Sequence, residues 1–426
     1  MKTNLLNKKR LVIGALVLAT LAPTIYAASA SANSNVTLNV WSWRPEDANA
    51  YNEIFSVYEK AHPGVTVNFQ TYIATQYPQV LTTGLTGRNG PDIVQVQAYG
   101  RVQPFILGRN LVALDGKIAG LKNIAKANLA GSSGHIDGKI YGVPFATQTI
   151  QMFYNKDIFA KLNLSVPTTW KSFIAVNEAL KKANIIPMSV GAKDTFLLPM
   201  ISEAFTSSVY GGKDFQKRIL AGDTTFEDPS YVKAISTFAS MKEYMPENVV
   251  GVSYTDSQTL FISGRAGMFP GGSFELGFFQ ASNPTLKIGV FPVPPAPGAE
   301  SKAALTPGYV DGSWSLNARS DQQAAALTLL RWMASKEFGQ LFSNRLSQMS
   351  PIKGVTFTNP LLRQMANNYA KHGSPYLLIT DFRWGSPSAT DVMAPGYQKI
   401  FLGKTTPAEL ATALQQGIST WFKPKK

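Results

Sequence analysis

Residues 36–69 read VTLNVWSWRPEDANAYNEIFSVYEKAHPGVTVNF, and this stretch decides the fold. The apolar run Val36–Trp41 predicts a strand, and Glu46–Ala61 predicts a helix that ends at His62-Pro63-Gly64. Val65–Phe69 predicts a second strand. The apolar residues that share one face of the helix are Tyr51, Ile54, Phe55 and Tyr58. A strand, a helix and a strand in this order are typical of an α/β protein.

The same alternation continues along the chain. A helical stretch over Gln76–Thr86 precedes a third predicted strand at Asp92–Val96. A helix that begins at Ser320 is expected to run through Leu341. Its start is marked by a predicted capping box of Ser320 with Gln323. Further helix starts are predicted at 167–170, at Asp228-Pro229, and at a second capping box, Thr406 with Glu409. Beyond the leader described next, roughly 390 residues remain, and this length fits two domains.

The first 32 residues have the layout of a secretory signal peptide. An apolar run over Leu11–Leu21 is followed by small residues at Ala28–Ala32, which offer cleavage sites. The run is too short to cross a bilayer, and Pro23 follows it, so cleavage is favoured over a membrane anchor. The cations before the run are Lys2, Lys8, Lys9 and Arg10.

The cysteine content and the charge limit the cellular compartment and the classes of binding partner that the protein can have. The chain has no cysteine, which excludes disulfides, thiolate metal sites and anchoring through a lipidated cysteine. A free periplasmic protein is therefore expected. The formal charge of +14 falls to +10 without the four leader cations, and the remaining Lys and Arg are scattered. A solvated basic surface is favoured over a nucleic-acid interface.

Motifs for catalysis or cofactor binding are missing from the sequence. It contains no phosphate-binding glycine loop, and Gly271–Glu275 lacks the final glycine of a nucleophile elbow. The histidines lie far apart and show no metal-ligand spacing; they are His62, His135 and His372. We therefore expect no cofactor, no metal and no enzymatic activity.

Aromatic residues are frequent near the predicted loops. A sugar ring has an apolar face and a polar rim, so a sugar site combines flat aromatic rings with carboxylates, amides and guanidinium groups. The alternative is that each aromatic residue belongs to a core. The aromatic residues beside Gly, Pro or polar neighbours are Trp41, Trp43, Tyr99, Phe274, Trp314 and Trp384.

Several segments, in order, resemble the extracellular solute-binding proteins of ABC sugar importers, the maltose-binding-protein-like group. The resemblance runs from about residue 36 to the C-terminus. The segments that carry it are Phe55–Val67, Gly90–Val96, Asp137–Phe145, Met152–Phe159, Pro167–Trp170 and Phe261–Phe269.

The resemblance implies a periplasmic-binding-protein-like α/β fold, in which crossing strands join two lobes and the ligand lies in the cleft between them. Hinge closure around the ligand is expected. The crossings are expected near Phe145–Ile150, Ile288–Pro295 and Ser315–Ser320. The first lobe would then contain residues 33–145 and 288–318, and the second 146–287 and 319–426.

The resemblance also implies ligand contacts at several loops and strand ends. Where the maltose binder of the family has a glutamate, this chain has Gln148, and Ser273 stands near the position of its stacking tryptophan, which argues against maltose. The complete set of implied ligand contacts is Trp43, Arg44, Glu46, Gln97, Tyr99, Gln148, Ser273, Phe274, Glu275, Asp311, Trp314, Arg383 and Trp384.

Structural roles compete with these assignments. Glu46 could stabilise only a helix N-terminus, and Ser273 could act only as an N-cap. Arg383 could form only a surface ion pair. Any of the tryptophans could be a core residue.

Three functions remain open. The first is a monomeric binding protein that delivers a mono- or oligosaccharide to the membrane permease of an ABC importer. The second is the same fold with another solute. The third is an exported glycoside hydrolase, which needs two carboxylates about 5–10 Å apart, and Glu275 with Asp311 is the one pair to nominate.

Overall fold

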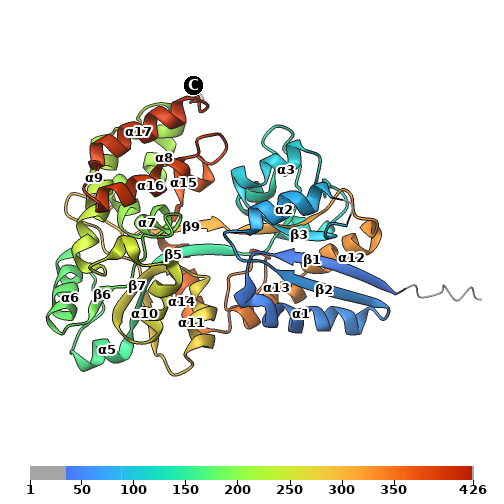
Figure 1. The fold of residues 1–426 in the computed structure, drawn as a ribbon, viewed down its shortest axis with the longest axis horizontal. Coiled ribbons are helices and arrows are strands. Elements are labelled where there is room, and N and C mark those ends of the chain that lie inside the picture. Colours follow the sequence, from blue (N-terminus) through green and yellow to red (C-terminus); the bar gives the residue numbers. More distant parts are fainter. Residues whose placement is uncertain (1–34, 88, 425–426) are drawn as a thin grey trace, which may run out of the picture. The chain divides into compact units, whose positions relative to one another are not determined.

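The computed structural model describes residues 35–87 and 89–424. The predicted leader, residues 1–32, lies outside these ranges. The strands within the described residues form two sheets, each with its own group of covering helices (Figure 1). No helix in these ranges has the length and apolar character needed to cross a membrane.

The first sheet contains the strands that open the chain. Strand β1 runs parallel to both of its neighbours, whereas β10 is antiparallel to β3. In spatial order the strands are β2 (Val65–Thr71), β1 (Val36–Ser42), β3 (Ile93–Gln97), β10 (Gly312–Leu316) and β4 (Val143–Pro144).

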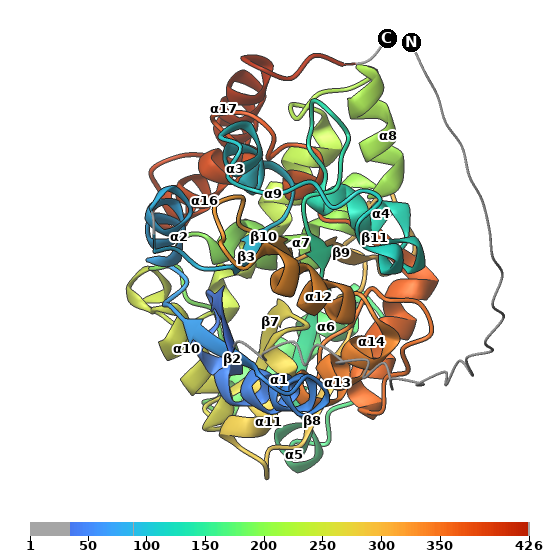
Figure 2. The ribbon, with the colours of Figure 1, turned by 90° about the vertical axis from the view of Figure 1, so that its right-hand side faces the viewer.

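Helices cover this first sheet and share a core with it. They are α1 (Ala48–Ala61), α2 (Tyr77–Thr86), α3 (Gln103–Leu107), α4 (Lys126–Leu129), α12 (Gln323–Met333) and α13 (Lys336–Leu346). Helices α1 and α13 are far apart in sequence but lie side by side (Figure 2). The sheet and these helices are called the first lobe below.

The second sheet is built around the long strand β5 (Thr147–Asn155), which pairs antiparallel with β7, β8 and β9. The other strands are β6 (Ile186–Met188), β7 (Ala266–Gly272), β8 (Ile288–Phe291), β9 (Thr306–Val310) and β11 (Gly373–Pro375). Helix α7 (Leu197–Tyr210) is buried along its whole length and packs against β5, β7 and β9.

The remaining helices pack around the second sheet and α7, and together they form the second lobe. They are α5 (Lys156–Lys161), α6 (Trp170–Lys182), α8 (Lys213–Ala221), α9 (Pro229–Ser240), α10 (Tyr254–Ile262), α11 (Glu275–Ser282), α14 (Pro360–His372), α15 (Leu377–Thr380), α16 (Ala389–Phe401) and α17 (Pro407–Ser419).

The predicted helix starts differ in their outcome. Asp228 caps α9 by accepting from the backbone N–H of Ser230, and the capping box of Thr406 with Glu409 is present. The capping box of Ser320 with Gln323 is wrong, because the Ser320 hydroxyl donates to Asp92 instead.

The single helix expected through Leu341 is also wrong. It divides into α12 and α13, and Ser335 caps the second helix by accepting from the N–H of Phe338 at 3.2 Å.

The expected division of the chain between the lobes also needs correction. Residues 288–310 were assigned to the first lobe, but β8 and β9 pair with β5 in the second sheet. Helices α12 and α13 were assigned to the second lobe, but Ala326, Leu329 and Phe342 are buried in the first core. The reason is that the local hydrophobic pattern of a strand or helix shows that it is buried, but does not show which of the two lobes it packs against.

The chain therefore crosses between the sheets at 145–146, at Asp311, and again after α13. Asp311 is the single residue between β9 of the second sheet and β10 of the first.

Candidate functional site

A buried network of polar side chains lies where the chain crosses between the lobes. Its centre is Gln148 at the start of β5, which is fully buried. Its Nε2 donates to Asp311 Oδ2 at 3.2 Å and to Gln348 Oε1 at 2.9 Å, and its Oε1 accepts from Ser273 Oγ at 2.6 Å. Gln348 Nε2 donates in turn to Asp47 Oδ2 at 3.3 Å. The network thus joins Asp47 of the first lobe to Ser273 of the second.

Arg44 extends this network with a charge. Its Nε donates to Asp47 Oδ2 at 2.5 Å, and its guanidinium lies 3.2 Å from Glu46 Oε1. Burial alone would lower the pKa of Arg44, but Asp47 and Glu46 outweigh burial and hold the pKa above its ordinary value. The guanidinium also lies 5.4 Å from the centre of the Phe274 ring, a cation–π contact between the lobes.

Glu275 is a buried carboxyl in the first turn of α11. Burial raises its pKa to about 7, although Oε1 accepts from the Tyr254 hydroxyl at 2.5 Å and Oε2 accepts from Gln258 Nε2 at 2.8 Å. Ser273 does not cap this helix; its hydroxyl donates to Gln148. The alternative reading of Ser273 as only an N-cap is therefore wrong.

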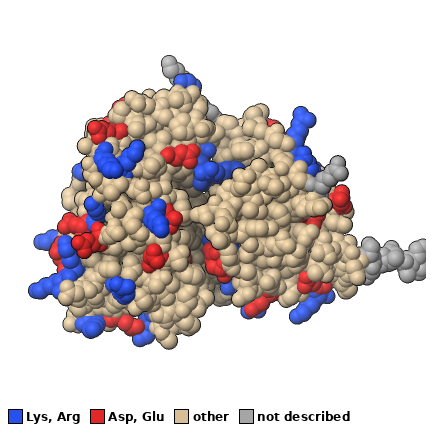
Figure 3. All heavy atoms as spheres, in the orientation of Figure 1, with Lys and Arg blue, Asp and Glu red and all other residues tan. Residues whose placement is uncertain are grey.

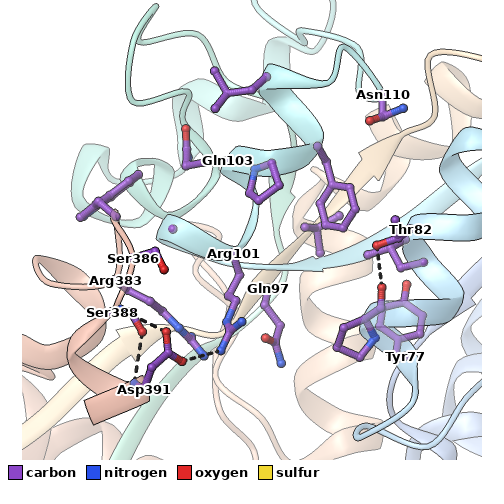
Figure 4. A pocket seen from close by; sticks show the side chains of 18 of the residues that line it. Tyr77, Thr82, Gln97, Arg101, Gln103, Asn110, Arg383, Ser386, Ser388 and Asp391 are labelled. Atoms are coloured by element: carbon purple, nitrogen blue, oxygen red, sulfur yellow. Dashed lines mark hydrogen bonds and ion pairs between the residues drawn. The ribbon is translucent and has the colours of Figure 1, made fainter. Parts of the chain in front are cut away.

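A pocket of about 580 Å³ lies between α2 and α3 of the first lobe and the segment 383–391 of the second (Figure 4). Figure 3 shows a crevice on this face of the described chain, with charged side chains near its rim. An ion pair joins the two walls of the pocket, because Arg101 lies 3.6 Å from Asp391 Oδ1. The polar and aromatic lining includes Tyr77, Gln97, Gln103, Arg383 and Trp384.

The structure brings most of the predicted residues together at the lobe boundary, in two groups. Tyr99 contacts Trp384, which lines the pocket: the two rings lie edge-on with their centres 6.1 Å apart. The Tyr99 hydroxyl accepts a hydrogen bond from Val310 N at 3.1 Å. The residues of the buried network and its extensions are Arg44, Glu46, Gln148, Ser273, Phe274, Glu275 and Asp311. The residues that line the pocket are Gln97, Arg383 and Trp384.

Two predicted stacking residues are corrected to core residues. Trp314 is fully buried, and its ring lies edge-on to Tyr51 at 5.4 Å. Trp43 is 6% exposed and packs between Tyr77 and Phe145, at 5.9 and 5.7 Å. Gly312 lets Trp43 pack closely in this core, since a Cβ there would lie 2.7 Å from the indole ring.

Several residues of the site were not predicted from the sequence. Asp47 lies close to Arg44 and Glu46, two predicted contacts, so its position in the sequence could have indicated that it belongs to the site. Arg101 lies two residues after the predicted contact Tyr99 and had the same kind of signal. The others carry no local signal, because each reaches the site only through the tertiary fold; they are Tyr254, Gln258, Gln348 and Asp391.

The chain is similar to known proteins over most of its length. The family model described as bacterial extracellular solute-binding protein matches residues 42–340. The multiple sugar-binding protein of Streptococcus mutans is 24% identical over 415 residues, which cover 94% of this chain and 93% of that protein.

Solved structures with the same fold include RafE in complex with raffinose and the GacH receptor of Streptomyces glaucescens. RafE has a TM-score of 0.73 at 23% identity and covers 90% of this chain and 99% of its own. GacH has a TM-score of 0.72 at 19% identity, with 90% and 97% covered. These likenesses confirm the predicted fold of two α/β lobes, and the family match shows that the chain belongs to the bacterial extracellular solute-binding proteins.

Proposed function

We propose that this protein is the solute-binding subunit of an ABC importer and that it captures a sugar between its two lobes. The observation that carries the proposal is the pocket of about 580 Å³ whose walls come from both lobes, next to a polar network that spans the same boundary. Relatives named for sugars, such as the multiple sugar-binding protein, support the same ligand class.

The pocket chemistry fits a sugar better than a purely apolar solute. Tyr77 and Trp384 supply aromatic surface, and Gln97 and Arg101 supply amide and guanidinium groups for hydroxyls. A pocket of this volume has room for a mono- or oligosaccharide.

Closure of the lobes follows from the position of the contacts. A ligand shifts an equilibrium between open and closed forms only if it binds one of them more tightly. A sugar held by Gln97 on one wall and Trp384 on the other would bind the closed form better. The permease would then distinguish a loaded protein from an empty one by its shape.

The matching family consists of extracellular binding proteins. We place the mature protein in the periplasm as a monomer, released by cleavage of the leader. The first lobe would contain residues 35–144 and 312–346, and the second 147–310 and 360–424. The protein is proposed to bind its sugar without converting it.

A thermal-shift panel of sugars, polyamines and inorganic anions tests the ligand class. A ligand that binds only the folded form adds stability by mass action, about 2.7 kcal/mol at a hundred times its Kd. We expect sugars alone to raise Tm. A shift with polyamines and none with any sugar would refute the sugar assignment.

Chromatography tests whether the protein acts only as a binder. Oligosaccharides incubated with the protein should be recovered intact. Their hydrolysis, abolished by Glu275→Gln, would instead support an exported glycoside hydrolase.

A further inference from the structure

We propose that the sugar carries an anionic group, a carboxylate or an ester sulfate or phosphate, and that this group binds between Arg101 and Arg383. The inference rests on the proposed function, because it concerns the ligand of the same pocket. The two arginines come from opposite lobes: Arg101 follows β3, and Arg383 lies between α15 and α16.

Arg383 is the first observation that points to an anion. It lines the pocket, and its Nε is buried without a hydrogen-bond partner in the described part of the chain. A buried N–H donor without an acceptor carries an uncompensated desolvation penalty. Burial, followed by the nearby charge of Arg101, lowers the pKa of Arg383 to about 10, so it stays charged at neutral pH.

The second observation is the arrangement of the two guanidinium groups. Figure 4 shows the side chain of Arg383 reaching toward that of Arg101, with Asp391 beside both. The two positive charges repel each other, and the single carboxylate of Asp391 compensates only one of them. A carboxylate or a sulfate offers oxygen atoms for both forks.

The charge balance of the pocket wall is the third observation. Three of the described residues that line it are charged, and they are Arg101, Arg383 and Asp391. Asp391 is already engaged, since Oδ1 pairs with Arg101 and Oδ2 accepts from the backbone N–H of Ser388 at 3.1 Å, which caps α16. One positive charge therefore remains for the ligand.

Neutral donors in the same pocket fit the rest of a sugar. The Gln97 side chain makes no hydrogen bond with any described residue, and Figure 4 shows it beside Arg101. It can therefore serve a hydroxyl next to the anionic group. A ligand with one acidic group and several hydroxyls, such as a uronic acid or a sugar ester, satisfies both features.

Calorimetry with matched sugar pairs tests the inference. The probes are galacturonic acid against galactose, glucuronic acid, glucose 6-sulfate and glucose 6-phosphate against glucose, and trimers of the uronic acids against neutral trimers. The two ester arms and the uronate arm separate the possible sources of the charge. We expect at least one acidic probe to bind 10-fold or more tightly than its neutral parent, which corresponds to about 1.4 kcal/mol. This preference should weaken as salt is added.

Three variants and one control test the residues. Arg383→Met should abolish the preference for the acidic probe and raise the Tm of the ligand-free protein, because it removes a buried N–H group that has no acceptor and a positive charge close to Arg101. A merely structural arginine would lower Tm. Asp391→Asn keeps an acceptor for the cap of α16 and should strengthen binding of the acidic probe, whereas Arg101→Gln should weaken it. Arg345→Gln removes an exposed guanidinium that pairs with Glu53 and should leave both affinities unchanged.

The possible outcomes separate this inference from the proposed function. If neutral sugars bind as tightly as their acidic partners, the anionic ligand is refuted and the sugar-binding function stands. If no sugar of either kind binds while a polyamine does, both are refuted. If inorganic sulfate or phosphate alone binds as tightly as any acidic sugar, the site is one for small anions and the inference is refuted.

Discussion

The buried carboxyl of Glu275 should make the stability of the protein depend on pH. Burial raises its pKa from 4.5 to about 7, although hydrogen bonds from Tyr254 and Gln258 favour the charged form. The folded protein therefore holds this proton more tightly than the unfolded chain does. The stability that comes from the bound proton is fully present below pH 4.5 and is lost as the pH rises through 7.

The magnitude follows from the size of the pKa shift. One pKa unit corresponds to about 1.4 kcal/mol, so full ionisation of Glu275 removes about 3 kcal/mol from the free energy of unfolding. Between about pH 5 and about pH 8 the loss through this group should be about 2–3 kcal/mol. Glu275→Gln keeps the shape and cannot ionise, so it should remove this part of the pH dependence.

Urea denaturation at the two pH values measures the effect. The buried carboxyls Glu203 and Asp311 have raised pKa values as well, but they remain in every variant and cancel in the comparison. Glu300→Gln, an exposed position, is the matched control and should keep the wild-type pH dependence. If Glu275→Gln unfolds cooperatively and loses as much stability between the two pH values as the wild type, the assigned pKa of Glu275 is wrong.

Three further predictions concern other buried groups. Trp314→Ala should lower the free energy of unfolding by about 3–5 kcal/mol, measured in urea, because the ring fills the first core; unchanged stability with weaker ligand binding would return Trp314 to the site. Gln148→Leu should lower the free energy of unfolding by about 1–3 kcal/mol, because Ser273 and other partners lose their hydrogen bonds. It should also reduce the decrease in radius of gyration that a bound sugar causes in solution scattering, and full compaction would contradict a role in closure. Burial raises the pKa of Glu203 to about 8, so Glu203→Gln, which keeps the contact with Tyr210, should stabilise the protein by about 3 kcal/mol at neutral pH; a lower Tm than wild type would show that the carboxyl contributes to stability.

Local features of the fold were predictable from the sequence. Strand β1, helix α1 and strand β2 lie within one or two residues of their predicted positions. Each depends on periodicity and on a terminating segment, which are properties of neighbouring residues. The cap at Asp228 and the box at Thr406 are local for the same reason.

The lobe to which a segment belongs was not predictable in the same way. Helix α12 is apolar on one face, and that face fits either core, while strand β9 is a short segment buried on both faces that could add to either sheet. The choice depends on pairing with strands that are more than a hundred residues away in sequence, such as β9 with β5. Periodicity contains no information about a distant partner.

The residues of the site also fall into two groups, those that the sequence indicated and those that only the tertiary structure brings to the site. Sequence resemblance by itself indicated Arg44, Gln148, Ser273 and Glu275, and the structure places them at one boundary between the lobes. Only the tertiary structure decided that Gln348 joins them, because it hydrogen-bonds to Gln148 across 200 positions of the chain. Only the tertiary structure decided, too, that Trp314 is enclosed by other aromatic rings, since the sequence specifies which residue is aromatic, whereas the surrounding packing determines whether the ring is exposed.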